Sequence, residues 1–172
     1  MALRIESVYD ANVYMNNDSK HGLAKEVVLP TVTYAFAAHE ALGLIGAPEF
    51  PTKLEAMEAT ITWDYPDNEA QIALANPLVA IDIDVRSSKR VESSSGVVDE
   101  QPVLAVLRGR SKSLPGGTFN NSDKVESQTS FAVHYYKLEI NMEEIFEIDV
   151  INNRLIIGGI DVMAKRKQNL GI

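Results

Sequence analysis

Apolar and polar residues alternate with a period of two over three stretches of this 172-residue chain. In residues 57–65, 79–86 and 146–150, every second side chain is apolar and the residues between them are mostly charged or Thr. Successive side chains of a β-strand point to opposite faces of its sheet, so the pattern predicts strands with one buried face and one wet face. Such strands are typical of antiparallel sheets. The sequence therefore predicts a mainly β protein.

Two other apolar stretches predict strands of a different kind. Residues 103–107 are apolar on both faces, which predicts a central strand that is covered on both sides. In residues 131–140 the apolar residues change parity, because Leu138 no longer shares a face with Phe131. A bulge near Tyr135 and Tyr136, or a strand that passes between two sheet environments, would produce this change. We expect a long, bent strand that is shared by two packed sheets.

Helix signals are few. Residues 66–76 begin with Pro and two acids and end at an Asn-Pro pair, which predicts a short helix. A second short helix is expected near the C-terminus, with Asp161 as its N-cap and the basic run 165–167 inside it. For residues 34–44, the Ala, Glu and Leu content favours a helix, but the residues alone leave a strand possible.

Three stretches are expected as loops, because they are rich in Gly, Pro, Ser or Asn and show no periodicity. They are residues 43–53, 87–101 and 114–124.

Length and composition exclude several classes of protein and several kinds of functional site. A chain of this length predicts one domain, residues 1–172, with a core of its own. It has no cysteine, which excludes disulfides and thiolate chemistry. Its net charge of -8 argues against a protein that grips nucleic acid. It has no apolar run long enough to span a bilayer, and its first residues lack the layout of a secretory signal.

The motifs of common enzyme classes are missing. Asp82 and Asp84 share a strand face and would suit a metal, but a solvated acidic face is the favoured interpretation. The histidines are scattered, and neither a Gly-x-Ser-x-Gly motif nor a phosphate-binding Gly-rich loop is present. We therefore expect no enzyme activity, no catalytic residue, no metal and no cofactor. The basic residues of 108–110 and 165–167 are expected to meet carboxylates of neighbouring copies.

Several short segments, taken together, form a pattern that each one alone would not. They are Asn12–Met15, Val28–Pro30, Leu54–Ala59, Val103–Arg110, Phe131–Ile140, Phe146–Asn152, Gly159–Asp161 and Asn169–Ile172. In this order and spacing they resemble the major tail tube protein of contractile-tailed bacteriophages, which is similar to the tube protein of R-type pyocins. The resemblance is strongest after residue 103, and the chain departs from the family pattern in residues 34–50 and 111–124.

The resemblance implies a fold and an assembly. The fold would be two packed antiparallel sheets, sandwich-like or barrel-like, with a flanking short helix and a short C-terminal helix. Residues 34–44 would then be a strand followed by an exposed loop. Six copies would form a ring around a shared inner barrel, and rings would stack through an extended loop around residues 43–53 to form a hollow tube. A ring would also remove the exposed edges of the sheet, which otherwise invite aggregation.

The resemblance also suggests roles for particular residues. For the exposed Phe50, anchoring to the adjacent ring and packing onto its own core both remain open. Candidate lumen-facing acids are Glu58, Asp82, Asp84, Glu147 and Asp149; the candidate ring-stacking loop is Ala47, Pro48, Glu49, Phe50, Pro51, Thr52 and Lys53; candidate inter-subunit contacts are Arg108, Arg110, Asp161, Lys165 and Arg166.

The partners implied are other copies of the chain, a tail sheath protein, a baseplate or tube initiator, a tail terminator and DNA in transit. The tube would be assembled in the bacterial host cytoplasm, would belong to the virion and would insert no segment of its own into a membrane. Sheath contraction would drive it through the bacterial envelope. The alternative is a pyocin-like tube or a type VI secretion ring protein, which carries no genome. A ligand-binding β-sandwich is a third possibility, and such a module would stay monomeric.

Overall fold

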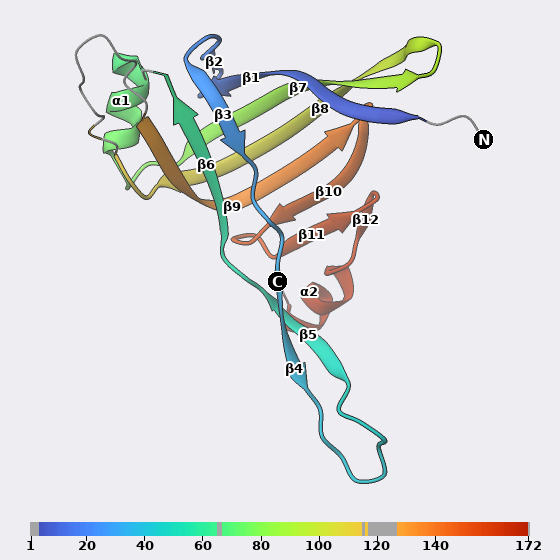
Figure 1. Ribbon diagram of the computed structural model, residues 1–172. Helices are drawn as coiled ribbons and strands as arrows, with labels where there is room; N and C mark the ends of the chain where they lie inside the picture. The colour runs from blue at the N-terminus through green and yellow to red at the C-terminus, as the bar shows by residue number, and fades with distance from the viewer. Residues whose placement is uncertain (1–3, 65–66, 115, 117–126, 172) are drawn as a thin grey trace.

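The computed structural model describes residues 4–64, 67–114, 116 and 127–171. These residues form a ten-stranded antiparallel sheet, a separate two-stranded sheet and two short helices (Figure 1). The mainly β prediction is confirmed. The strands are β1 Ile5–Met15, β2 Asp18–Ser19, β3 Ala24–Val28, β4 Tyr34–Ala38, β5 Glu49–Leu54, β6 Met57–Trp63, β7 Ile81–Ser93, β8 Gly96–Ser111, β9 Ser127–Ile140, β10 Glu143–Asp149, β11 Arg154–Ile157 and β12 Ile160–Asp161; the helices are α1 Asn68–Ala75 and α2 Ala164–Leu170.

The alternating stretches form strands as predicted. In β6, burial alternates along the strand, and Ile61 and Trp63 are fully buried. In β7, Ile81 and Ile83 are buried in the same way, whereas Val79 precedes the strand and is exposed. In β10, Ile148 is buried as predicted, and Glu147 on the other face is buried as well, although its neighbour Ile145 is 39% exposed.

Strand β9 is the branch point of the sheet. One edge of β9 pairs with β8, while the other edge pairs first with β6 and then with β10. The β8–β9 register skips His134, since Gly109 is opposite Val133 and Arg108 is opposite Tyr135. This skip is a β-bulge, which bends a strand and increases its twist. The expected bulge and the expected change of sheet environment are therefore both present in β9.

Folding of the sheet at β9 places β3 and β6 across the face of β7, β8 and β9 (Figure 1). The core lies between these layers and is formed by β6 together with β1, β7, β8, β9 and α1. Trp63 and Phe131 are its two largest fully buried side chains. The Trp63 indole N–H donates a hydrogen bond of 3.2 Å to the Thr129 hydroxyl, so its polar atom is satisfied inside the core. The two packed layers thus belong to one hydrogen-bonded sheet.

Helix α1 forms where the sequence predicts it. Its N-cap is Asp67, whose Oδ1 accepts a 2.7 Å hydrogen bond from the backbone N–H of Ala70. The other carboxylate oxygen of Asp67 accepts a 2.7 Å hydrogen bond from Lys20, which is only 2% exposed and also contacts Asp18. Burial lowers the pKa of Lys20, but the hydrogen bonds to these two carboxylates outweigh it and the pKa is raised. This ion pair ties the start of α1 to the β2 turn.

The loop prediction for residues 87–101 is wrong. These residues continue β7 and β8 as a long hairpin that turns at residues 94–95. Within the hairpin, Arg90 forms a 2.9 Å ion pair with Glu100, and Lys89 forms one of 2.9 Å with Glu6 on β1. Charged pairs across strands stabilise this hairpin, in which Val91 is the one buried side chain of residues 87–93, so the stretch lacks the apolar alternation that the sequence argument requires.

Residues 34–54 form the β4–β5 hairpin, which projects away from the rest of the molecule (Figure 1). Residues 34–38 are a strand, as the resemblance implies. The expected loop of residues 43–53 is a loop only up to Pro48, because β5 begins at Glu49. Pro51 is tolerated because the sheet has only two strands, and both are edge strands.

Two other sequence expectations concern single elements. Asp161 does not cap α2: the helix begins at Ala164 with Met163 as its N-cap. Asp161 instead accepts a 2.9 Å hydrogen bond from the backbone N–H of Met163 and forms a 2.7 Å ion pair with Lys167. Most of the loop predicted for residues 114–124 lies outside the described residues.

Candidate assembly surfaces

The five candidate lumen-facing acids lie on one face of the sheet, opposite the core. Cross-strand partners point to the same face, so the register shows which residues are neighbours. Asp82 is opposite Arg108, which is opposite Tyr135, which in turn is opposite Asp149. Two further rows of cross-strand partners lie beside this row on the same face. They are Asp84–Val106–Lys137–Glu147 and Glu58–Ala132–Arg110.

Most of these acids are paired with a cation of the same chain. Glu58 contacts Lys112, and their hydrogen bond lowers the pKa of Glu58. Asp82 contacts Arg108 through both carboxylate oxygens, and the hydrogen bonding raises the pKa of Arg108. Two more of the candidate acids are paired, Asp84 with Arg86 at 3.6 Å and Glu147 with Arg154 at 3.3 Å, while the Asp149 carboxylate accepts hydrogen bonds from Asn152.

This face is therefore a mosaic of paired charges rather than an acidic surface. The sequence argument assigned the acids to the wet face but did not identify their partners. The pairing depends on register between strands that lie far apart in the sequence, as Glu58 and Lys112 do.

The predicted ring-stacking segment, residues 47–53, lies in the β4–β5 hairpin. Its Pro48 carbonyl accepts a 2.9 Å hydrogen bond from the backbone N–H of His39, which closes the turn end of the hairpin. The Phe50 side chain is 55% exposed, and its ring contact is with His39, at 6.4 Å between centroids. Phe50 therefore does not pack in the protein core.

The predicted inter-subunit residues lie in two places. Arg108 and Arg110 are exposed on the outer face of β8, where Arg108 is already bound to Asp82. Lys165 and Arg166 are exposed on α2, which has no buried residue, and Asp161 lies just before this helix. The structure does not bring these two groups together at one site.

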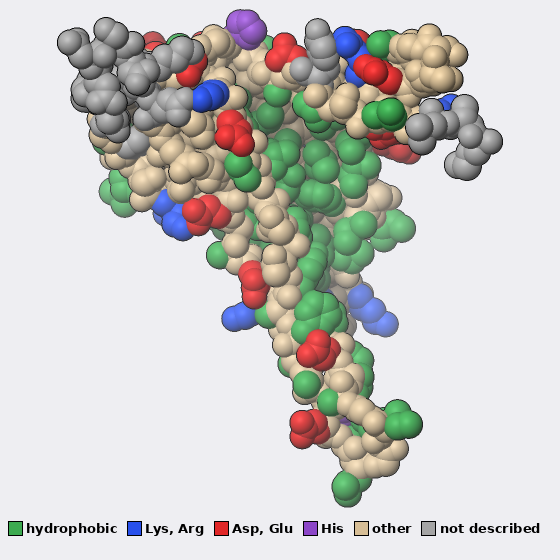
Figure 2. Space-filling view, in the orientation of Figure 1, with side chains coloured by type: hydrophobic (Ala, Val, Ile, Leu, Met, Phe, Trp, Pro, Cys, Tyr) green, Lys and Arg blue, Asp and Glu red, His purple; other side chains and the backbone are tan. Residues whose placement is uncertain are grey.

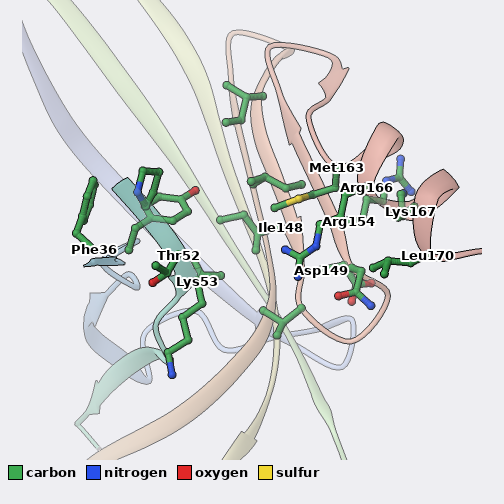
Figure 3. Close-up of a pocket in the computed structure, with 17 residues that line it drawn as sticks. Phe36, Thr52, Lys53, Ile148, Asp149, Arg154, Met163, Arg166, Lys167 and Leu170 are labelled. Carbon is green, nitrogen blue, oxygen red and sulfur yellow. The ribbon is translucent and has the colours of Figure 1, made fainter. Parts of the chain in front are cut away.

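An apolar groove of about 770 Å³ lies between the β4–β5 hairpin and the C-terminal part of the chain. Figure 3 shows Phe36, Thr52 and Lys53 on one side of it and Met163, Arg166 and Leu170 on the other. Figure 2 shows apolar side chains continuing from the body of the molecule down along the hairpin. Sequence reasoning missed this groove, because its walls come from residues 34–54 and 148–170, and only the tertiary fold places them side by side.

Strand β1 has a largely open edge. It pairs with β7 along one edge, while on its other edge the described pairing is limited to Tyr14 and Met15 with β2. Ile5 is 57% exposed and Val8 is 66% exposed on this strand. An open edge carries free backbone N–H and C=O groups that can pair with another chain.

Within the described part of the chain, no group of three or more His, Asp or Glu residues is placed to hold a metal ion. The same residues include no helix with the length and apolar character needed to cross a bilayer. The features of note are surfaces that suit contact with other proteins.

Comparison with known families identifies the chain's relatives. The family model for the phage tail tube protein FII matches residues 5–171. The chain belongs to this family. The tail tube protein of Escherichia phage P2 is 27% identical over 165 residues, which cover 94% of each chain. The protein is therefore a phage tail tube protein, a component of the phage tail and hence of the virion. This family is structural and non-enzymatic.

Two solved structures share the fold. One is a chain of the sheath–tube complex of an extracellular contractile injection system, PVC, in its extended state; the TM-score is 0.58 at 12% identity, over 77% of this chain and 90% of that chain. The other comes from the sheath/tube terminator of the same kind of system, with a TM-score of 0.55 at 12% identity, over 77% of this chain and 95% of that chain. At this identity, the likeness concerns the fold alone.

Proposed function

We propose that six copies of the chain form a ring and that rings stack into the inner tube of a contractile phage tail. The tube is driven through the bacterial envelope by sheath contraction and conducts DNA. The observation that carries this proposal is the family match over residues 5–171. The similarity to the P2 tail tube protein supports the phage version over a pyocin-like or type VI version, because both comparisons name phage tails.

The shape of the subunit suits assembly by its sheet edges. The open edge of β1 exposes Ile5 and Val8, and a ring that continues the sheet from copy to copy would cover both. Our candidates for polar contacts between subunits remain Arg108, Arg110, Asp161 and the two α2 cations, Lys165 and Arg166. The hairpin segment of residues 47–53 is our candidate for the contact between rings.

The proposal also names other partners. They are a tail sheath protein around the tube, a baseplate or tube initiator at one end and a terminator at the other. The sheath and the terminator are supported by the structural neighbours, which come from a sheath–tube complex and a sheath/tube terminator. Assembly would take place in the host cytoplasm.

Electron microscopy of the purified chain tests the assembly. We expect rings or long cylinders at high protein concentration, and isolated single copies would contradict the proposal. Val8→Lys should lower the assembled fraction, because a charge on an open edge strand disfavours edge pairing. Ile72→Lys, at a residue of α1 that is 72% exposed, is the matched control and should assemble normally. If both variants assemble like the wild type, the role of the β1 edge is wrong.

We further propose that the face carrying Glu58 and Asp82 lines the bore. Each of these carboxylates holds a cation of the same chain, so Lys112 and Arg108 are neutralised before DNA passes. A cation that is already paired offers less to a phosphate backbone, whose binding to proteins depends on release of counterions by Lys and Arg. The bore would then stay non-adhesive while containing basic residues.

Glu58→Lys combined with Asp82→Lys should make the tube bind DNA. The change adds two cations per copy and leaves Lys112 and Arg108 without their partners. We expect assembled tubes to retain DNA in a pelleting assay at low salt, with retention falling as salt rises, and we expect DNA ejection to be impaired. Glu69→Lys with Asp99→Lys changes net charge equally at exposed sites elsewhere and should retain less DNA. Equal retention by the two double variants, or unaltered ejection, would contradict the bore assignment.

A further inference from the structure

The groove beside the β4–β5 hairpin leaves a large apolar area open to water. Phe36 is 57% exposed, Ile157 49% and Leu170 60%, and all three line it. A contiguous exposed apolar surface that is rimmed by polar residues marks an interaction site. No element of the described chain covers these three side chains, so the surface is open to an occupant from another copy.

The tip of the same hairpin, residues 39–49, is also apolar and exposed. Leu42 and Ile45 are completely exposed, and Leu44 is 51% exposed. Residues 39–48 extend beyond the paired residues of β4 and β5, and no residue of the tip belongs to the hydrophobic core. The chain therefore presents an apolar protrusion and an apolar groove, each without a partner among the described residues.

The charges of the tip and of the groove are complementary. The tip contains Glu40 and Glu49 and has no Lys or Arg. Four cations line the groove against a single acid. Among the described residues, two of these cations, Lys53 and Arg166, form no ion pair within the chain, and neither do Glu40 and Glu49. Complementary charges at the rim of an apolar contact set its register and partner.

The geometry excludes a contact within one copy. The groove lies at the base of the hairpin, where Phe36 and Leu54 form part of its wall, and the tip lies at the far end (Figure 1). A tip can thus enter only the groove of another copy. This contact joins two different surfaces, and its repetition generates an open row of copies unless the rotation closes it.

We propose that the groove binds the hairpin tip of a second copy, with Leu42 and Ile45 against the apolar wall and Glu40 and Glu49 near Lys53 and Arg166. The inference rests on the proposed function, because in a tube this contact would join one ring to the next. The surface that receives the tip then includes α2. The apolar anchor of the contact lies in the tip, at Leu42 and Ile45, rather than at Phe50 alone.

Disulfide cross-linking tests the contact directly, because the chain has no cysteine of its own. In the double variant Ile45→Cys with Ile157→Cys, each copy carries one thiol at the tip and one in the groove. Oxidation at concentrations that favour assembly should give a ladder of many covalently linked chains on a non-reducing gel. A mixture of the two single variants should stop at two chains, since each copy then has only one thiol. A pair of Ile45→Cys and Val97→Cys, with Val97 55% exposed on the distant β7–β8 hairpin, should give no such ladder.

A charged tip gives a second readout. Ile45→Asp should weaken stacking about tenfold to a hundredfold, because it removes the burial of one large apolar side chain, while rings persist in electron micrographs. Arg166→Glu should also shorten the stacks, and adding Glu49→Lys should partly restore them.

If the double-cysteine protein gives no ladder and Ile45→Asp forms tubes of normal length, the groove contact is wrong while the tube function stands. If the wild type forms neither rings nor tubes, the proposed function fails, and the presence or absence of the ladder still decides the contact.

Discussion

Replacing Trp63 with Ala should lower the free energy of unfolding by about 3–5 kcal/mol, the range for removal of a large aromatic side chain from a core. Trp63 is fully buried and lies on β6, the strand that folds over the main sheet. The cavity would lie between the two layers, and the Thr129 hydroxyl, which is also fully buried, would lose its donor. Since domains are stabilised by about 5–15 kcal/mol in total, this change alone brings the subunit close to unfolding.

Urea denaturation followed by far-UV circular dichroism measures this effect, because Trp63 is the only tryptophan and its fluorescence is lost in the variant. Trp63→Phe should cost clearly less than Trp63→Ala, since most of the ring volume is kept. Thr129→Val keeps the shape of residue 129 but leaves the indole N–H unpaired, and it should cost about 1–3 kcal/mol. If Trp63→Ala is no less stable than Trp63→Phe, the layer formed by β6 does not pack as described.

Replacing Gly109 with Ala should destabilise the fold by about 2–3 kcal/mol, near the upper end for overpacking a core. A Cβ at this position would lie 2.6 Å from the carbonyl oxygen of Ala132 and 3.3 Å from the Cα of Val133. Both atoms belong to the backbone of β9, so no side-chain rotation can relieve the contact. The strand would have to move away from β8 beside the bulge at His134, where the sheet divides.

Gly46→Ala is the matched control for this substitution. Gly46 lies in the hairpin tip, has an ordinary backbone conformation and has no atom within 4 Å of the added Cβ. Its free energy of unfolding, measured by urea denaturation, should remain within about 0.5 kcal/mol of the wild-type value, as is usual for surface sites. Equal stability of the Gly109→Ala and Gly46→Ala proteins would show that β8 and β9 are not in close contact at this point.

The elements with a strong local signal were predictable from the sequence. The alternation of residues 57–65 and 79–86 predicts β6 and the start of β7, and the parity change in 131–140 predicts the bend in β9. Asp67 and the following residues predict α1 because an N-cap acts within one helical turn. The polar stretch 87–101 was mistaken for a loop, because its strands are held by register and charged pairs, and a single buried apolar residue, Val91, gives no alternation to detect.

The candidate surfaces were predictable only in part. The sequence placed Glu58, Asp82 and Asp84 on a wet face, but their pairing with Lys112, Arg108 and Arg86 appears only in the structure. It identified the exposed hairpin segment through the resemblance, but it gave no sign of the groove beside α2.

By itself, the sequence determined that this protein is mainly antiparallel β, because side-chain periodicity and cap residues act over a few positions. Its resemblance to a known family, carried by the order and spacing of several segments, indicated a tail tube protein. The tertiary structure alone decided that one sheet branches at His134, that most of the candidate acids on its outer face are paired with cations, and that a hairpin and a C-terminal helix enclose a groove. Each of these features depends on residues that lie tens of positions apart in the chain, and only the folded backbone brings them within contact distance.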